Sequence, residues 1–390
     1  MPPALSTHTG APLPLDGIRA DLLDCVQANL AVLADHVHGP GTHLRLGARL
    51  NLPERPLPDG LPTADASLDT RLATDAALVG LRPIRRARLA PAELLAEAAR
   101  HPGVHYVVAD SFHLPWLPYH GNAHMEHSFL LTAGPDTWHV TDAYRIETQW
   151  GAAVPGEHVL STQDLSGFAD AEFISFAPVD LAPAPPAVLP YQPQRYVTSY
   201  GQWPDRRRAL EQLATETWLL ARSRKLHAAY RAQWASRAEE SEAERAHLAA
   251  WDRLVEHAYL AHRRVARGRA EPAGTVDRLG ELLVADQEVF AGTPAPHAPH
   301  EPGAALPGGS STRGRIAAVV AEVLGVAEQL LTDGAVLNSL PSFTSFRLVE
   351  IIERIESELG RELDGDELDP DRLRTVDDLC RLAGERLPAD

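Results

Sequence analysis

The chain has 390 residues, 44% of them hydrophobic and 23% charged, which is typical of two or three globular domains. Its 53 acidic and 36 basic residues leave a net charge of −17, which argues against nonspecific DNA or anionic-membrane binding. The two cysteines, Cys25 and Cys380, lie at opposite ends of the chain and do not favour a disulfide framework. Because no apolar run approaches the length of a membrane span and no signal-peptide pattern is present, we expect a cytoplasmic protein.

In chain order, the first strong pattern is a helix over residues 22–37. Its apolar side chains share one helical face: Leu23, Val26, Leu30, Leu33 and Val37. Asp24 is the expected N-cap, which places Cys25 in the first turn. A second helix is expected over 91–101, with Pro91 near its start.

Runs of β-branched and aromatic residues then predict strands over 105–110, 127–134 and 137–144. The Gly-Pro-Asp turn at 134–136 joins the last two of these into a β-hairpin. A further apolar run closes this segment near 173–181.

The second half of the chain is expected to be helical. A Pro-rich connector at 182–194 precedes two or three helices within 205–290. The Ala, Pro, Gly, Ser and His of 291–312 cannot build a core and predict a flexible linker. Residues 313–390 form an acidic unit with 17 acidic and 9 basic residues, a net charge of −8. Its expected helices span 316–325, 345–359 and 375–387.

The most specific motif is FTSFRLVE, which starts at Phe343 and opens an amphipathic helix with an acidic face. Together with the downstream TVDDL segment, it resembles the acyl or peptidyl carrier protein family. The resemblance implies that Ser345 carries 4′-phosphopantetheine, attached by a phosphopantetheinyl transferase. Thr344 stands where that family usually has Asp. A purely structural role for Ser345, as a helix N-cap, is the alternative.

Cys25, His127 and Asp142 are candidates for nucleophilic catalysis. A thiol in the first turn of a helix meets the positive end of the helix dipole, which predicts a lowered thiol pKa. An imidazole can hold the thiolate and move its proton, and a carboxylate can fix the imidazole tautomer. In the predicted hairpin, His127 and Asp142 lie roughly across from each other. His124, three residues from His127, is the alternative base.

The sequence LLDCVQANLAVLADHV and the segment 110–144 resemble the N-terminal domain of the butirosin-type acyltransferases, papain-like proteins akin to double-glycine peptidases. The matching positions of the second segment include Asp110, Leu114, Pro115, Pro118 and Tyr119. The resemblance implies an α+β fold, with a papain-like cysteine acyltransferase or peptidase domain, a helical extension, a flexible linker and a C-terminal helical-bundle carrier protein. The expected domains are 1–185 (catalytic), 186–290 (extension), 291–312 (linker) and 313–390 (carrier).

The same resemblance implies acyl transfer in natural-product biosynthesis, such as antibiotic assembly. Cys25 would take an acyl or aminoacyl group from a phosphopantetheine thioester, and His127, oriented by Asp142, would deprotonate a small-molecule amine acceptor. An adenylation enzyme or other carrier proteins are further implied partners, without nucleic acid or membrane. The Cys25 backbone N–H would hold the oxyanion. Papain-like enzymes often use a Gln before the cysteine as the second oxyanion donor, but Arg19 stands at that position here. Gln27 and Asn29 are near enough in sequence to be considered instead, and neither is favoured.

Several alternatives accompany these predictions. A thioesterase or peptidase would use water in place of the amine. In a non-catalytic scaffold, Cys25 would have no catalytic role. The spacing of His120, His124 and His127 could suit zinc, but the stretch does not read as a helix, so no metal is expected. Arg263 and Arg264 either form a solvated helix face or dock the acidic carrier helix. Aromatic side chains that either line a substrate pocket or fill the core are Trp116, Tyr119 and Trp138.

Overall fold

The computed structural model describes residues 13–134, 137–237 and 239–291, and beyond these residues 312–324 and separate positions up to 382. The start of the chain, most of the predicted linker, and Thr344 with Ser345 lie outside the described residues.

A six-stranded antiparallel sheet organises the first half of the chain. Its strand order is β10-β7-β6-β5-β11-β4. The strands are β4 (Leu81–Leu89), β5 (His105–Asp110), β6 (Glu126–Ala133), β7 (Trp138–Asp142), β10 (Gly156–Leu160) and β11 (Ala171–Pro178). The central strands β5 and β6 are buried almost along their whole length, as their Val, Leu and Phe content requires. They therefore form a rigid base for the residues at their ends.

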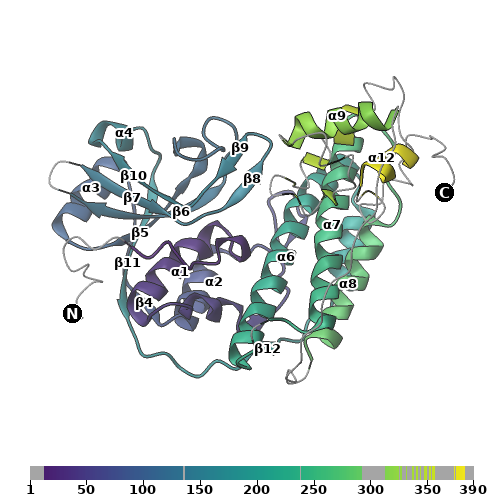
Figure 1. The fold of residues 1–390 in the computed structure, drawn as a ribbon. Coiled ribbons are helices and arrows are strands. Elements are labelled where there is room, and N and C mark those ends of the chain that lie inside the picture. Colours follow the sequence, from purple (N-terminus) through teal and green to yellow (C-terminus); the bar gives the residue numbers. More distant parts are fainter. Residues whose placement is uncertain are drawn as a thin grey trace.

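Helix α1 (Cys25–His38) packs on β5 and β6, with α2 (Leu68–Leu78) beside it and α3 (Pro91–Arg100) also against the sheet (Figure 1). The first turn of α1 is locked to the sheet, since the Tyr106 hydroxyl donates to the Val26 carbonyl at 2.7 Å. Short elements complete this lobe: η1 (Ala20–Leu22), η2 (Thr42–Gly47), β1 (Arg49–Leu50), β2 (Arg55–Pro56), β3 (Pro62–Thr63), η3 (Ser111–His113), β8 (Ile146–Thr148), β9 (Gly151–Ala153) and α4 (Thr162–Ser166).

Three long helices stand beside the sheet lobe: α6 (Arg206–Trp234), α7 (Glu242–Ala266) and α8 (Thr275–Val289) (Figure 1). They are preceded by β12 (Ala187–Val188), which pairs with β1, and by α5 (Gln194–Gln202). The bundle has its own apolar core around the fully buried Trp251. These helices and the sheet make the fold a mixture of helix and sheet.

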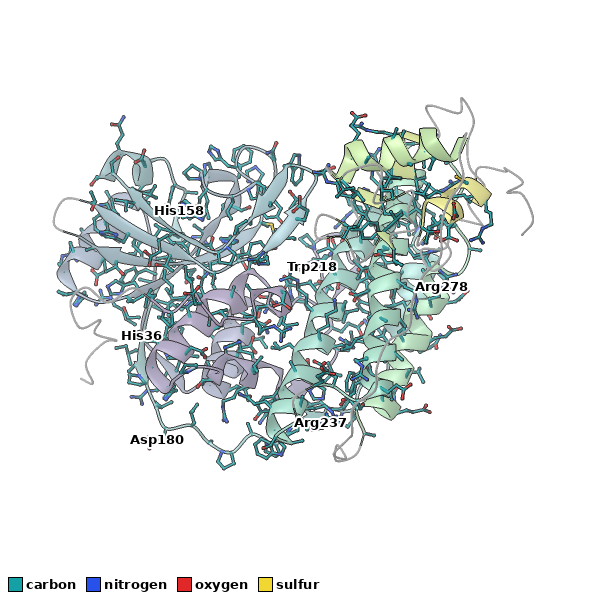
Figure 2. All side chains as sticks on the ribbon, in the orientation of Figure 1. His36, His158, Asp180, Trp218, Arg237 and Arg278 are labelled. Atoms are coloured by element: carbon teal, nitrogen blue, oxygen red, sulfur yellow. The ribbon has the colours of Figure 1, made fainter. Side chains whose placement is uncertain are left out.

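Helix α6 joins the bundle to the sheet lobe. Trp218 packs against the sheet-lobe core and lies on the side of α6 that faces that lobe (Figure 2). Gly47 approaches the same helix so closely that an added Cβ would lie 2.4 Å from the Leu226 carbonyl oxygen. Any larger residue at position 47 would force α6 away from the α1 region.

The C-terminal segment contains α9 (Thr312–Leu324) and α12 (Val376–Leu382). Their apolar side chains share one buried cluster with Leu348, Ile351 and Ile355. Leu260 of α7 belongs to the same cluster. The acidic C-terminal unit therefore has a core of its own, to which the bundle contributes Leu260 and Tyr259.

Most of the predicted elements are confirmed. The structure contains α1 with its Asp24 cap, α3 with Pro91 at its start, the three predicted strands and three helices in the region 205–290. Helix α2 and the edge strand β4 were not predicted. The central part of β4, Arg85-Arg86-Ala87-Arg88, is too polar to show strand patterning, and its pairing with β11 decides its conformation. The domain boundaries stay a prediction.

A buried ion pair supports the helical bundle. The Arg224 guanidinium bonds the Asp286 carboxylate at 2.6 Å, and both side chains are fully buried. We expect Arg224→Met to lower the free energy of unfolding by about 3 kcal/mol, because the buried Asp286 carboxylate loses its arginine partner and keeps only the bonds from Tyr191, His247 and Trp251. The matched control is Arg206→Met, which breaks a partly exposed pair with Glu271 and should cost about 1 kcal/mol or less. Urea denaturation that shows equal losses for both variants would contradict this assignment.

Candidate active site

Cys25 is the first residue of α1, immediately after the Asp24 cap. The Asp24 carboxylate accepts from the Val26 and Gln27 backbone N–H groups, both at 2.9 Å. The half-buried Cys25 thiol donates to the Glu126 carbonyl oxygen, with a sulfur–oxygen distance of 3.3 Å. This bond attaches the start of α1 to Glu126, the first residue of β6, which directly precedes His127.

His127 and Asp142 form a buried pair, as the hairpin predicted. Their Nε2–Oδ2 distance is 2.7 Å, and the His127 side chain is fully buried. The register pairs Leu130 with Thr141, so the two residues meet diagonally and not directly across the ladder. Within the described part of the chain, the buried Nδ1 of His127 has no hydrogen-bond partner. That nitrogen is the one left to exchange a proton.

Three further donors hold the Asp142 carboxylate. Trp116 Nε1 donates to Oδ2 at 2.9 Å, while Asn29 Nδ2 and the Tyr144 backbone N–H donate to Oδ1 at 3.2 and 3.0 Å. With His127, both oxygens are therefore fully used. Sequence reasoning missed these supporting roles, although Asn29 lies one helical turn after Cys25, on the same face.

The electrostatics of the thiol differ from the sequence-based expectation. Burial, followed by the nearby Asp24 carboxylate, raises the pKa of Cys25, and the opposing effect of Arg71 is smaller. The expected lowering by the helix dipole is therefore wrong, because desolvation of a thiolate outweighs one helix end. The resting thiol is protonated, in agreement with its role as a donor to Glu126.

The pKa of Asp142 moves the other way. Burial acts to raise it, but His127 and the other donors together hold it below the usual range of a carboxyl group. Asp142 is consequently ionised and can fix His127 Nε2 as the protonated nitrogen.

The side chains considered for the oxyanion are engaged elsewhere. The Gln27 amide donates to Asp75 at 3.4 Å, and Asn29 serves Asp142. The half-exposed Arg19 guanidinium bonds Asp21. The Cys25 backbone N–H, at the first position of α1, is a donor for which an α-helix supplies no internal partner.

A cavity of about 190 Å³ lies behind the helix start. It is lined by Asp24, Gln27 and Asp75 on one side and by Leu219 and Arg222 of α6 on the other. Arg71 also lines this cavity and forms ion pairs with Asp24 and Asp65, both at 2.7 Å.

The other histidines of the motif do not join His127. His124 pairs with Asp110 at 2.7 Å and stacks on Phe112, with its side chain 68% exposed. His120 is exposed. No group of metal-ligating side chains that could hold an ion was found among the residues that the structure describes.

The aromatic residues divide between the site and the core. Trp116 contacts Asp142, whereas the Trp138 indole donates to Thr162. Tyr119 and Tyr144 both lie near enough to Cys25 to be coupled to it electrostatically, and the centroids of the Tyr144 and His127 rings are 5.2 Å apart. Tyr119 and Tyr144 therefore border the candidate site.

Arginines of the bundle mostly stabilise the fold. Arg222 donates to the carbonyl oxygens of Ala20, Leu23 and Arg145, and so ties α6 to the segments before α1 and after β7. Arg264 is buried near the end of α7. Of the two arginines proposed to dock the carrier, Arg263 alone remains partly exposed.

A protonated Cys25 predicts a steep dependence of its reactivity on pH. The rate of alkylation by iodoacetamide should rise about tenfold per pH unit between pH 6 and 9, because only the thiolate reacts. Mass spectrometry of the Cys25 peptide measures this rate. Cys25→Ala is the control, since the remaining Cys380 is fully buried. A fast, pH-independent reaction at pH 6 would instead indicate a permanent thiolate.

The Asp142 carboxylate predicts a stability that depends on pH. Because its folded-state pKa lies below the unfolded value, its stabilisation is present above about pH 4 and is lost as the pH falls through the folded-state pKa. Asp142→Asn should lower the free energy of unfolding by about 2–3 kcal/mol at pH 7, with the deficit shrinking in acid. Asp110→Asn, beside the exposed His124, should cost about 1 kcal/mol or less. A deficit of Asp142→Asn that is independent of pH would contradict the prediction.

Comparison with known proteins identifies one part of the chain. The family described as the phosphopantetheine attachment site matches residues 314–383. A search of curated proteins found no similar protein. In the described part of the chain, every helix is too short or too polar to cross a membrane.

The matched range includes Ser345, which lies between the described Phe343 and the helical Arg347. The described neighbours fit such a domain, because Leu348, Ile351 and Ile355 bury one helical face in the C-terminal core. The chain therefore handles acyl groups as phosphopantetheine thioesters and is a partner of a phosphopantetheinyl transferase. Residues 314–383 are a carrier-protein domain, and its covalent cofactor is 4′-phosphopantetheine.

Proposed function

We propose that this chain is a cysteine acyltransferase that moves an acyl or aminoacyl group from a phosphopantetheine thioester to an amine. One observation carries the proposal: a cysteine at a helix start bonds the Glu126 carbonyl, one residue before the histidine of a buried His–Asp pair, in a chain that also contains a carrier domain. A helix that begins with cysteine and packs on an antiparallel sheet also supports a papain-like, butirosin-type assignment of the first domain. Natural-product assembly is the matching biological setting.

The first half-reaction begins with the protonated thiol. The attached cofactor supplies a thioester, whose carbonyl carbon is the electrophile. His127 Nδ1 takes the proton from Cys25 as the sulfur attacks that carbon. His127 would then give this proton to the departing thiol of the cofactor as the acyl carbon–sulfur bond to that thiol breaks. The acyl group is now bound to Cys25 as a thioester.

The second half-reaction transfers the acyl group to the amine. The amine nitrogen attacks the acyl carbon on Cys25, and His127 Nδ1 accepts a proton from that nitrogen. The bond to the Cys25 sulfur breaks, the sulfur regains the proton, and an amide is released. Ser345 would be the attachment residue that brings the thioester to Cys25.

Asp142 has a constant role in both halves. Its ionised carboxylate keeps the proton on Nε2, so that Nδ1 is the acceptor, and it stabilises the imidazolium that forms. The Cys25 backbone N–H at the helix start is suited to the oxyanion of each tetrahedral intermediate. A raised thiol pKa fits this scheme, because proton transfer to His127 then accompanies attack.

The proposal is tested by following an acyl group through the holo protein. A promiscuous transferase and acetyl-coenzyme A load the chain, and peptide mass mapping locates the acetyl group. We expect one acetyl-phosphopantetheine on the Ser345 peptide and then migration of acetyl to Cys25. In Cys25→Ala the peptide that contains position 25 should carry no acetyl group, while Cys380→Ala should not change the migration. Ser345→Ala should take up no phosphopantetheine.

The products of the same reaction separate the proposal from its competitors. In the presence of a panel of small amines, an acyltransferase yields an acetamide. Release of free acetate alone would assign a thioesterase. Loading and release that are identical in Cys25→Ala would overturn the catalytic assignment and leave a carrier scaffold.

A further inference from the structure

The C-terminal half of α7 presents a face that the bundle core does not use. Leu254, Ala258 and Ala261 enter the core between α6, α7 and α8, whereas Leu260 does not belong to that core. Leu260 is nevertheless only 5% exposed, because it lies in the same buried cluster as Ile316 and Ile351 of the carrier domain. Tyr259 packs against this cluster as well.

We propose that Tyr259, Leu260 and Arg263, called here the α7 docking face, bind the carrier domain of the same chain. Charge supports this occupant, because residues 313–390 have a net charge of −8 and the partly exposed Arg263 lies in the last turn of α7. The connection also supports it, since the stretch between Ala291 and Thr312 is long enough to let the carrier reach α7.

The position of this face relates it to the candidate active site. Arg263 Nη1 donates to Gln149 Oε1 at 3.3 Å, in the turn between β8 and β9. The next residue, Trp150, is 43% exposed, and its ring packs edge-on against the Tyr119 ring, with the two centroids 6.0 Å apart. Tyr119 is coupled electrostatically to Tyr144, whose ring lies beside that of His127. Contacts thus run from α7 along the β8–β9 turn to the residues that border the site.

Docking on α7 therefore places the carrier beside the edge of the sheet lobe that carries β8 and β9 (Figure 1). We propose that this position lets an acyl group on the cofactor arm reach Cys25. This consequence rests on the proposed function, whereas the docking itself does not.

The test uses the full-length holo protein with Leu260→Asp, which places a charge in the apolar contact. The matched control is Val284→Asp, at a 58% exposed position of the neighbouring α8. Small-angle X-ray scattering should show a larger radius of gyration for Leu260→Asp only, because loss of a buried leucine lowers the docked population about tenfold to a hundredfold. Acyl migration to Cys25 should slow by a comparable factor.

The two measurements fail separately. If the radius of gyration and the rate of acyl migration in Leu260→Asp equal those of the wild type, the docking face is overturned. An expanded Leu260→Asp variant whose wild-type parent never acylates Cys25 would refute the proposed function and leave the docking intact. A scattering mass that doubles with concentration in the wild type but not in Leu260→Asp would show that the carrier docks on a second copy of the chain. That result would overturn the same-chain assignment. If Leu260→Asp fails to fold, Arg263→Glu replaces it, with the same expected direction for both readouts.

Discussion

The candidate site depends on one buried carboxylate. Asp142 is nearly inaccessible to solvent, yet it is ionised because four donors from four parts of the chain converge on its two oxygens. Three of these donors fix different elements, namely β6 through His127, α1 through Asn29 and the loop after η3 through Trp116, while the fourth is the nearby Tyr144 backbone N–H. A buried charge is costly unless it is fully bonded. The carboxylate therefore specifies how helix, sheet and loop come together around Cys25.

The thiol beside this carboxylate has a character that the helix start alone would not indicate. The N-terminal end of α1 favours negative charge, but burial and the Asp24 cap oppose a thiolate more strongly. Asp24 is needed as the cap, so the same residue that begins the helix also keeps the thiol neutral. Reactivity then depends on a base at the right distance, which makes the free Nδ1 of His127 the central feature of the proposed chemistry.

The helical bundle contacts the sheet lobe and the carrier domain through two different kinds of interaction. Toward the sheet lobe, the close approach at Gly47 and the bonds of Arg222 to three backbone carbonyls leave little freedom for α6. Toward the carrier domain, the described apolar contact is concentrated at Leu260 and Tyr259. A small contact of this kind is compatible with a carrier that must dock and leave, because affinity is then limited. The bundle is in this way a rigid support on one side and, on the proposed docking, a smaller contact surface for the carrier on the other.

The sequence by itself determined the elements with strong local signals. Apolar periodicity and the Asp24 cap predicted α1, runs of β-branched and aromatic residues with the Gly-Pro-Asp turn predicted the hairpin, and the FTSFRLVE motif predicted the carrier domain. Cys25, His127 and Asp142 were found because each stands at the end of such an element. Helix α2, strand β4 and the partners of Asp142 were decided by the tertiary structure. Trp116 and Asn29 lie 26 and 113 positions from Asp142, and no local pattern reports contacts over that separation. The direction of the Cys25 pKa was decided there too, since desolvation depends on what packs around the thiol and not on its place in a helix.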